Sequence, residues 1–535
     1  MRDMRVTDYI APVRIVASES CKDCDILLKE ATGQATTAPR QECILESGGW
    51  VVLDFGTEYY GGVELTVGGY DGQEDRNLLL TFGESVSETF SHPDYFHSIQ
   101  ETKLHLTPWS VLTFGKLGFR FVKLENPETF SIGIQGIRCC YVHREFPVQG
   151  SFRCSDPLLN DIWDASVRTL SLCMQDLMWD GVKRDQLVWM GDLFPEIFAC
   201  SVIYGHQDVV EKSLDFLRDE TPLPRMMNGC GTYSFWWILA QRYWYHRFGS
   251  LDYLKKQQEY LKKLLLHFSG MVSNDGELSF SGGYLLLDWA TGISPEAGPS
   301  IRNGSHAVLR LAFLAGAELC HILGDEETAL LSERAAEKLL KKELPLSECS
   351  TAANAFQVLA GFRDAGDVYD RCFDGKLPYG LSTFLGCFVL DACAEAGHRK
   401  EALDYLRQYW GGMLSVGSTT FWEHFDVDWL KGAGRIDEIV PAGKHDIHGE
   451  YGEGCFKSYR NSFCHGWGSM PAEWLIRQIC GLEFIDAGTV RFTPDLCGLE
   501  WVEAHIPAET GMIQIYAAPG KKELHLPERI QLKQD

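Results

Sequence analysis

Acidic and aromatic residues are concentrated between positions 179 and 196. The segment contains three aspartates, one arginine and two tryptophans: Asp180, Asp185, Asp192, Arg184, Trp179 and Trp189. It includes Gly181 and Gly191 and separates two helical patterns, so most of it should be a loop, where catalytic groups concentrate. Indole faces pack on the C–H groups of sugars, and carboxyl groups accept hydroxyl hydrogen bonds or donate protons. The segment suits a sugar site; the alternative is a solvated loop with an Arg–Asp pair and two core tryptophans.

Two later segments carry the same residue types. Residues 418–426 place Glu423 between aromatic side chains, and residues 461–469 place His465 shortly before a tryptophan. Glycosidic hydrolysis needs an acid on the leaving oxygen and a carboxylate opposite, ~6.5–9.5 Å away if that carboxylate activates water. Two acids from distant loops can meet this spacing, whereas one loop rarely does. The alternatives are an ion-paired Glu423, a structural His465 and core tryptophans at both segments.

Other chemistries have weaker support in the sequence. Residues 445–450 read His-Asp-Ile-His-Gly-Glu but lack the i, i+4 spacing of a helical zinc motif. Cys21 and Cys24 form a single C-x-x-C without a second pair. The sequence also contains no nucleophile elbow and no nucleotide-binding loop. We therefore expect neither a metal nor a cofactor.

Size and charge restrict the class of protein. A chain of 535 residues predicts two or three domains. Its 49 basic and 74 acidic residues give a net charge of −25, which disfavours nucleic acids and anionic membranes as partners. The N-terminus has no continuous apolar run, and no later segment offers ~20 uncharged apolar residues. Because eighteen cysteines in such a chain are typical of buried thiols, we expect a cytoplasmic protein.

The hydrophobic patterns divide the chain into three domains. Residues 1–150 contain short alternating segments, such as 62–68, and predict an antiparallel β-sandwich. Asp156 and Pro157 mark a helix start, and helical patterns joined by long loops continue to position 484, with one predicted at 197–204 after the acidic loop. Stacked helical hairpins would gather the long loops at one end, so residues 151–484 predict an α/α toroid. Residues 485–535 alternate again and predict a small β-sandwich.

Taken together, these motifs resemble the bacterial α-L-rhamnosidases of glycoside hydrolase family 78. The family's Asp-x-x-x-Arg-(Glu/Asp)-x-x-x-Trp-x-Gly-Asp signature is matched by Asp180, Arg184, Asp185, Trp189, Gly191 and Asp192. Its Thr-x-Trp-Glu segment is matched by Thr420-Phe421-Trp422-Glu423, and its Asn/His segment by Asn461 to His465. The order of the three domains also matches, so the resemblance covers nearly the whole chain.

The resemblance implies a fold, a reaction and a set of roles. The fold would be an (α/α)6 barrel, and the reaction an inverting hydrolysis that releases terminal α-L-rhamnose from small glycosides or oligosaccharides. Asp185 would be the general acid, favoured in its neutral form by apolar neighbours such as Leu187, and Glu423 the general base. The residues implied to bind substrate are Asp180, Arg184, Trp189, Asp192, Asp288, Trp289, Trp422 and His465. Many members carry Glu at position 185, and Asp is one methylene shorter.

Three alternatives stay open. One is a glycosidase for another sugar on the same toroid, and another is a lyase that cuts next to a uronic acid. The third is a carbohydrate-binding protein with a degenerate site. A rhamnose-containing carbohydrate is the expected partner, and a homodimer is not decided by the sequence.

Overall fold

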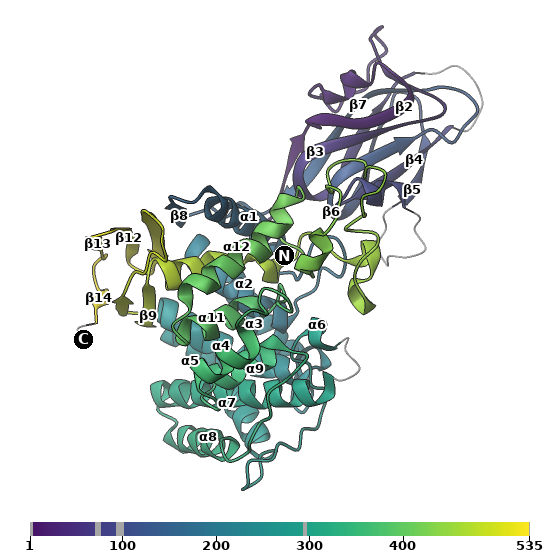
Figure 1. Cartoon of the computed structure of the whole chain (residues 1–535). Helices are drawn as coiled ribbons and strands as arrows, with labels where there is room; N and C mark the ends of the chain where they lie inside the picture. Colours follow the sequence, from purple (N-terminus) through teal and green to yellow (C-terminus); the bar gives the residue numbers. More distant parts are fainter. Residues whose placement is uncertain (1–3, 70–75, 92–100, 293–296, 534–535) are drawn as a thin grey trace.

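The computed structural model describes residues 4–69, 76–91, 101–292 and 297–533. In Figure 1 an N-terminal β-domain lies at one end, a helical domain in the middle and a small C-terminal group of strands beside the helices. The chain is therefore a multidomain protein of mixed helix and sheet, as the sequence predicted.

Seven strands form the N-terminal sheet in the order β1-β7-β3-β6-β4-β5, with β2 paired to β3. Their bounds are β1 Val6–Ile10, β2 Arg14–Lys22, β3 Cys43–Val67, β4 Arg76–Gly83, β5 Glu101–Leu106, β6 Val111–Glu125 and β7 Ile132–His143. The long strand β3 shifts register between Asp54 and Tyr59, where Gly56 has φ 87°. Such irregularities let one strand bend around a core. The predicted N-terminal sheet is confirmed, although the pair β3–β7 is parallel rather than antiparallel.

Thirteen α-helices follow among the described residues. They are α1 Pro157–Cys173, α2 Met190–Ile203, α3 Asp208–Glu220, α4 Gly231–Phe248, α5 Leu251–Ser269, α6 Trp289–Gly292, α7 Ala297–Leu323, α8 Glu326–Leu339, α9 Thr351–Leu359, α10 Ala365–Val368, α11 Gly386–Glu395, α12 Arg399–Ser415 and α13 Pro471–Trp474. The predicted start of α1 is confirmed, since the Asp156 side chain accepts a hydrogen bond from Leu158 N. Helix α2 begins at Met190 rather than at 197, and its residues are all buried, which outweighs the hydrogen bond lost at Pro195.

Six helices pack against one another in the succession α13-α2-α4-α7-α9-α11, and the remaining long helices cover them. Helix α7 is long and apolar enough to cross a membrane by composition, but most of it is buried in this packing. Long connections precede the six helices, with α6 between the third connection and α7 and a 3-10 turn, Gly466–Ser469, between the last connection and α13: 174–189, 221–230, 270–288, 340–350, 374–385 and 416–465.

The six connections, together with α6 and the first residue of α9, touch one another in a closed cycle. Pairs in contact are Gly181 with His465, Val188 with Asn228, Cys230 with Tyr284, Thr291 with Ser350, Thr351 with Gly380, and Tyr379 with Lys431. The long loops therefore gather at one end of the helical domain, as the hairpin arrangement requires.

The C-terminal strands form sheets of three and four strands. They are β9 Leu482–Asp486, β10 Thr489–Phe492, β11 Val502–Ala508, β12 Gly511–Ala518, β13 Lys521–His525 and β14 Gln531–Leu532. Strand β8, Ser151–Cys154, joins them by pairing with β11. The boundaries predicted at 151 and 485 are therefore displaced: residues 151–154 belong with the C-terminal sheet, and β9 begins before 485.

Candidate functional site

The acidic loop is closed upon itself by hydrogen bonds at its two ends. Asp180 is buried, and its Oδ1 accepts from the amide of Leu187 at 2.8 Å, while its own amide donates to Leu187 O at 3.0 Å. At the tip, Asp185 and Gln186 have φ values of 62° and 54°, in the left-handed region that Asp tolerates better than most residues. This turn directs the Asp185 carboxylate outward, with 40% of the side chain exposed, next to the buried Arg184.

Arg184 connects the two predicted catalytic acids. Its Nη1 donates to Asp185 Oδ2 and its Nη2 donates to Glu423 Oε2. Its Nε donates to the carbonyl of Arg460 at 2.9 Å, which fixes the plane of the guanidinium. Burial opposes the charge of Arg184, but Glu423 and Asp185 raise its pKa, so the guanidinium stays positive. One planar cation thus binds two carboxylates through different nitrogens.

Glu423 is fixed by the neighbouring loop. Its amide donates to Ser462 O at 2.8 Å, and its Oε2 accepts from the amide of Ser462 at 3.2 Å. The indole of Trp467 donates to its carbonyl at 3.0 Å. The two segments 418–426 and 461–469 are therefore joined through their backbones, and the carboxylate has one defined position.

His465 lies beside three carboxylates. Its Nε2 is 4.0 Å from both Asp180 Oδ2 and Glu423 Oε1, and its Nδ1 is 3.6 Å from Asp192 Oδ1. Burial, together with the charge of Arg184, lowers the pKa of His465 well below its usual range, so the ring is neutral. Burial raises the pKa of both Asp180 and Asp192 well above the usual range. The group is a buried polar floor of acids and a neutral imidazole.

An aromatic wall stands next to this floor. The rings of Trp189 and Trp289 are perpendicular with centroids 6.4 Å apart, and Trp289 Nε1 donates to the hydroxyl of Tyr233 at 3.1 Å. Both indoles are partly buried, so part of each ring is open. Asp288 is buried and accepts from the amide of Ala290 at 3.0 Å, and burial raises its pKa to about 6. The predicted Asp-Trp loop therefore borders the acidic loop.

Two expectations about individual residues are wrong. Trp422 is 0% exposed, stacks on Phe463 with centroids 3.8 Å apart and donates its N–H to Ser418 Oγ, so it is a core residue that cannot touch a substrate. The apolar surroundings expected for Asp185 are also absent, because Leu187 is half exposed and the carboxylate pairs with Arg184.

Several buried charged residues next to the site were missed from the sequence. Lys183 lies between Glu84 and Glu88 of the N-terminal domain, with Nζ–O distances of 3.1 and 2.6 Å. Glu84 follows β4 and Glu88 lies in the short helix Ser87–Phe90, and neither belongs to a recognisable sequence motif. In the sequence, Lys183 has no feature that distinguishes it from an exposed loop lysine. Glu196, one turn after Asp192 on α2, is also buried, and burial raises its pKa well above the usual range.

The run 445–450 is divided between surface and interior. His445 pairs with Glu450 at 3.0 Å on the surface, whereas the buried His448 bonds Ser85 Oγ and Asn461 O. Glu84, Glu88 and His448 lie close enough together to hold an ion among the described residues. The ammonium of Lys183 already provides a cation for both glutamates.

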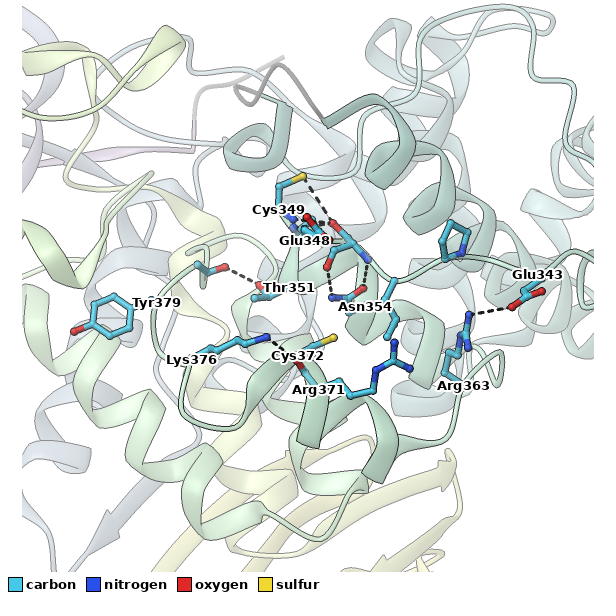
Figure 2. Close-up of a pocket in the computed structure, with 15 residues that line it drawn as sticks. Glu343, Glu348, Cys349, Thr351, Asn354, Arg363, Arg371, Cys372, Lys376 and Tyr379 are labelled. Atoms are coloured by element: carbon cyan, nitrogen blue, oxygen red, sulfur yellow. Dashed lines mark hydrogen bonds and ion pairs between the residues drawn. The ribbon is translucent and has the colours of Figure 1, made fainter.

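A separate cavity of about 960 Å³ opens between the loops 340–350 and 374–385 (Figure 2). Its wall carries Arg363, Arg371 and Lys376, and Ser350 on its rim bonds Thr291 at 2.9 Å. It belongs to the same loop end of the helical domain. No predicted site residue is among its described lining residues.

Comparison with known proteins agrees with this arrangement. Residues 147–342 match the family model described as the bacterial alpha-L-rhamnosidase 6 hairpin glycosidase domain. Among solved structures, a GH78 family rhamnosidase of Bacillus sp. GL1 is 22% identical, with a TM-score of 0.74, over 92% of this chain and 54% of that one. A rhamnosidase from Klebsiella oxytoca with rhamnose bound is 21% identical, with a TM-score of 0.69, over 89% of this chain and 96% of that one.

A third structure, a Streptomyces avermitilis α-L-rhamnosidase complexed with L-rhamnose, is 18% identical, with a TM-score of 0.67, over 90% of this chain and 48% of that one. The chain spans about half the length of the first and third of these proteins. No curated protein sequence matches it. At these identities the structural matches show a shared fold.

Proposed function

We propose that this protein is a glycoside hydrolase that releases terminal α-L-rhamnose. The match of residues 147–342 to the bacterial α-L-rhamnosidase six-hairpin glycosidase domain supports this proposal. The single observation that carries the proposal is the sharing of Arg184 by Asp185 and Glu423. Two carboxylates from distant loops thereby face one space, which general acid and base catalysis requires.

The two acids occupy different environments, which supports different roles. Glu423 is buried, held by Ser462 and paired with a permanent cation, so it suits the carboxylate that takes a proton from water. Asp185 is exposed at the tip of a strained turn and can reach a leaving oxygen outside the floor. To donate a proton it must leave the guanidinium of Arg184 when substrate enters. The two carboxylates bind different nitrogens of one guanidinium, and inversion requires that a water enters between them.

The floor and the wall supply sugar recognition. Asp180, Asp192 and the neutral His465 offer donors and acceptors for hydroxyl groups, since a protonated carboxyl and an imidazole can each do both. The open parts of Trp189 and Trp289 suit C–H faces and the C6 methyl group. We infer an (α/α)6 barrel from the six packed helices and their cycle of loops. We also propose a small glycoside as substrate and a cytoplasmic location.

The deciding experiment is a screen of nitrophenyl glycosides followed by proton NMR of the anomer first released. We expect hydrolysis of the α-L-rhamnoside with release of the β anomer. Release of the α anomer would exclude inversion, and hydrolysis of a different glycoside would reassign the sugar. New ultraviolet absorbance from a C4–C5 double bond would instead show a lyase, and binding without turnover would show a degenerate site.

A further inference from the structure

Lys183 is the centre of a buried contact between the N-terminal domain and the acidic loop. Its side chain is 1% exposed, with Nζ 3.1 Å from Glu84 Oε2 and 2.6 Å from Glu88 Oε1. Glu84 directly follows β4, and Glu88 lies in the short helix Ser87–Phe90. Lys183 Nζ also donates to Asn461 O at 3.5 Å. The residue before Arg184 is thus attached to another domain and to the second catalytic loop.

Glu84 is bonded to both loops at once. Besides Lys183, its Oε1 accepts from Ser462 Oγ at 3.1 Å and its Oε2 accepts from the amide of Phe463 at 2.7 Å. Ser462 is the residue whose backbone holds Glu423 through two hydrogen bonds. The Glu84 carboxylate of the N-terminal domain therefore holds Ser462, which in turn holds Glu423. The same carboxylate also pairs with Lys183, the residue directly before Arg184.

The cost of this contact indicates a positional role. Charged groups taken out of water lose their favourable hydration, and apolar packing often replaces a buried ion pair without loss of stability. Burial raises the pKa of Glu88 to about 7 despite the nearby ammonium, which shows how strongly this environment opposes charge. What a charged cluster provides, and an apolar contact does not, is a fixed direction for several hydrogen bonds at once.

We propose that Glu84 and Lys183 are positioning residues that set the separation of Asp185 and Glu423, so that the N-terminal domain completes the catalytic site. This rests on the proposed hydrolase function. Neither residue touches the substrate; each acts through the loop it holds. Displacement of a catalytic group by about 1 Å can cost on the order of 100-fold in rate.

The test compares Glu84→Gln with Glu64→Gln. Glu64 lies in the same domain and pairs with Arg138 at 2.8 Å, away from both loops. We expect Glu84→Gln to lower kcat on a nitrophenyl α-L-rhamnoside by roughly 10- to 100-fold with KM changed by less than about threefold. Glu64→Gln should keep wild-type kcat. Ser462→Ala, which removes one hydrogen bond to Glu84 without changing charge, should lower kcat in the same sense and serves if Glu84→Gln does not fold.

Hydrogen–deuterium exchange measures how firmly Glu84 holds the two loops, independently of activity. Exchange should become faster at residues 180–189 and 458–466 in Glu84→Gln and stay at the wild-type rate there in Glu64→Gln. Unchanged exchange and kcat in both Glu84→Gln and Ser462→Ala would overturn the proposal, as would an equal loss of kcat in Glu64→Gln. If the wild-type protein cleaves no rhamnoside, the hydrolase function fails, and the exchange experiment alone decides whether Glu84 orders the two loops.

Discussion

Arg184 binds Glu423 across 239 positions of the chain, and the same guanidinium binds its sequence neighbour Asp185. The relationship is not a surface ion pair, because Arg184 and Glu423 are both buried. A buried guanidinium that donates to two carboxylates fixes the position of each carboxylate relative to the other. Five predictions can be tested at this site and in its surroundings.

Glu423→Gln should lower kcat on a nitrophenyl α-L-rhamnoside by about 10²–10⁴-fold, because an amide cannot take a proton from water. Initial rates measure this effect. Glu438→Gln is the matched control, since Glu438 belongs to the same long connection but is exposed. Near-normal turnover in Glu423→Gln would remove the general base from the mechanism.

Asp185→Asn should depend on the leaving group. A nitrophenolate leaves with little protonation, so the variant should lose more activity on an alkyl α-L-rhamnoside than on the nitrophenyl compound. Comparing kcat/KM for the two substrates in wild type and variant isolates the role of the acid. An equal loss on both substrates would argue against proton donation by Asp185.

Arg184→Lys should lower kcat by roughly 10- to 100-fold although the charge is kept. A lysine ammonium is a point charge and cannot present two parallel edges to two carboxylates. Arg435→Lys is the control, because Arg435 pairs with Asp437 on an exposed part of the same connection as Glu423. Full activity of Arg184→Lys would mean that charge alone suffices.

The two tryptophans near the site should respond differently. Trp289→Ala should raise KM several-fold with little loss of stability, since part of the ring is open to a ligand. Trp422→Ala should cost about 3–5 kcal/mol of stability, because the fully buried indole leaves a cavity. Thermal melting and Michaelis–Menten kinetics on both variants separate these effects. A raised KM at unchanged stability in Trp422→Ala would restore its predicted role in binding.

Asp288 should make stability depend on pH. Burial raises its pKa to about 6 in the folded protein, above the value of about 4 in the unfolded chain, so the folded state holds the proton more tightly. Its stabilising contribution is therefore present below pH 4 and is lost as the pH rises through 6. Relative to Asp288→Asn, the wild type should lose up to about 3 kcal/mol over this interval. Melting temperatures of both proteins between pH 4 and 7 test it; a constant difference would contradict it.

Much of the site could be predicted from residue types. The segments around Asp185, Glu423 and His465 were each singled out by acids among aromatic rings, and the structure brings them together. The resemblance to bacterial α-L-rhamnosidases is confirmed for residues 147–342, which match the family model of their six-hairpin glycosidase domain. The assigned catalytic roles stay predictions until the variants are measured.

What the sequence did not reveal depends on contacts between domains. Lys183 and Glu84 lie 99 positions apart in ordinary surroundings, and only the docking of the N-terminal sheet buries them together. Trp422 was misread because a tryptophan beside an acid looks the same in sequence whether it faces a ligand or the core. The early start of α2 was hidden by Gly191 and Pro195, whose usual helix-breaking effect is outweighed by complete burial.

The pairing of Ser151–Cys154 with the tail has a consequence for how far the C-terminal end of the polypeptide can be shortened. Main-chain partners run from Val502–Cys154 to His505–Ser151, so the chain enters and leaves the helical domain through one small sheet. Truncation before residue 500 would remove β11, the strand that pairs with β8, and would expose the buried Phe152. We expect this to loosen α1 as well as α13. Because β8 also contacts α1, the tail supports the helix that leads into the acidic loop.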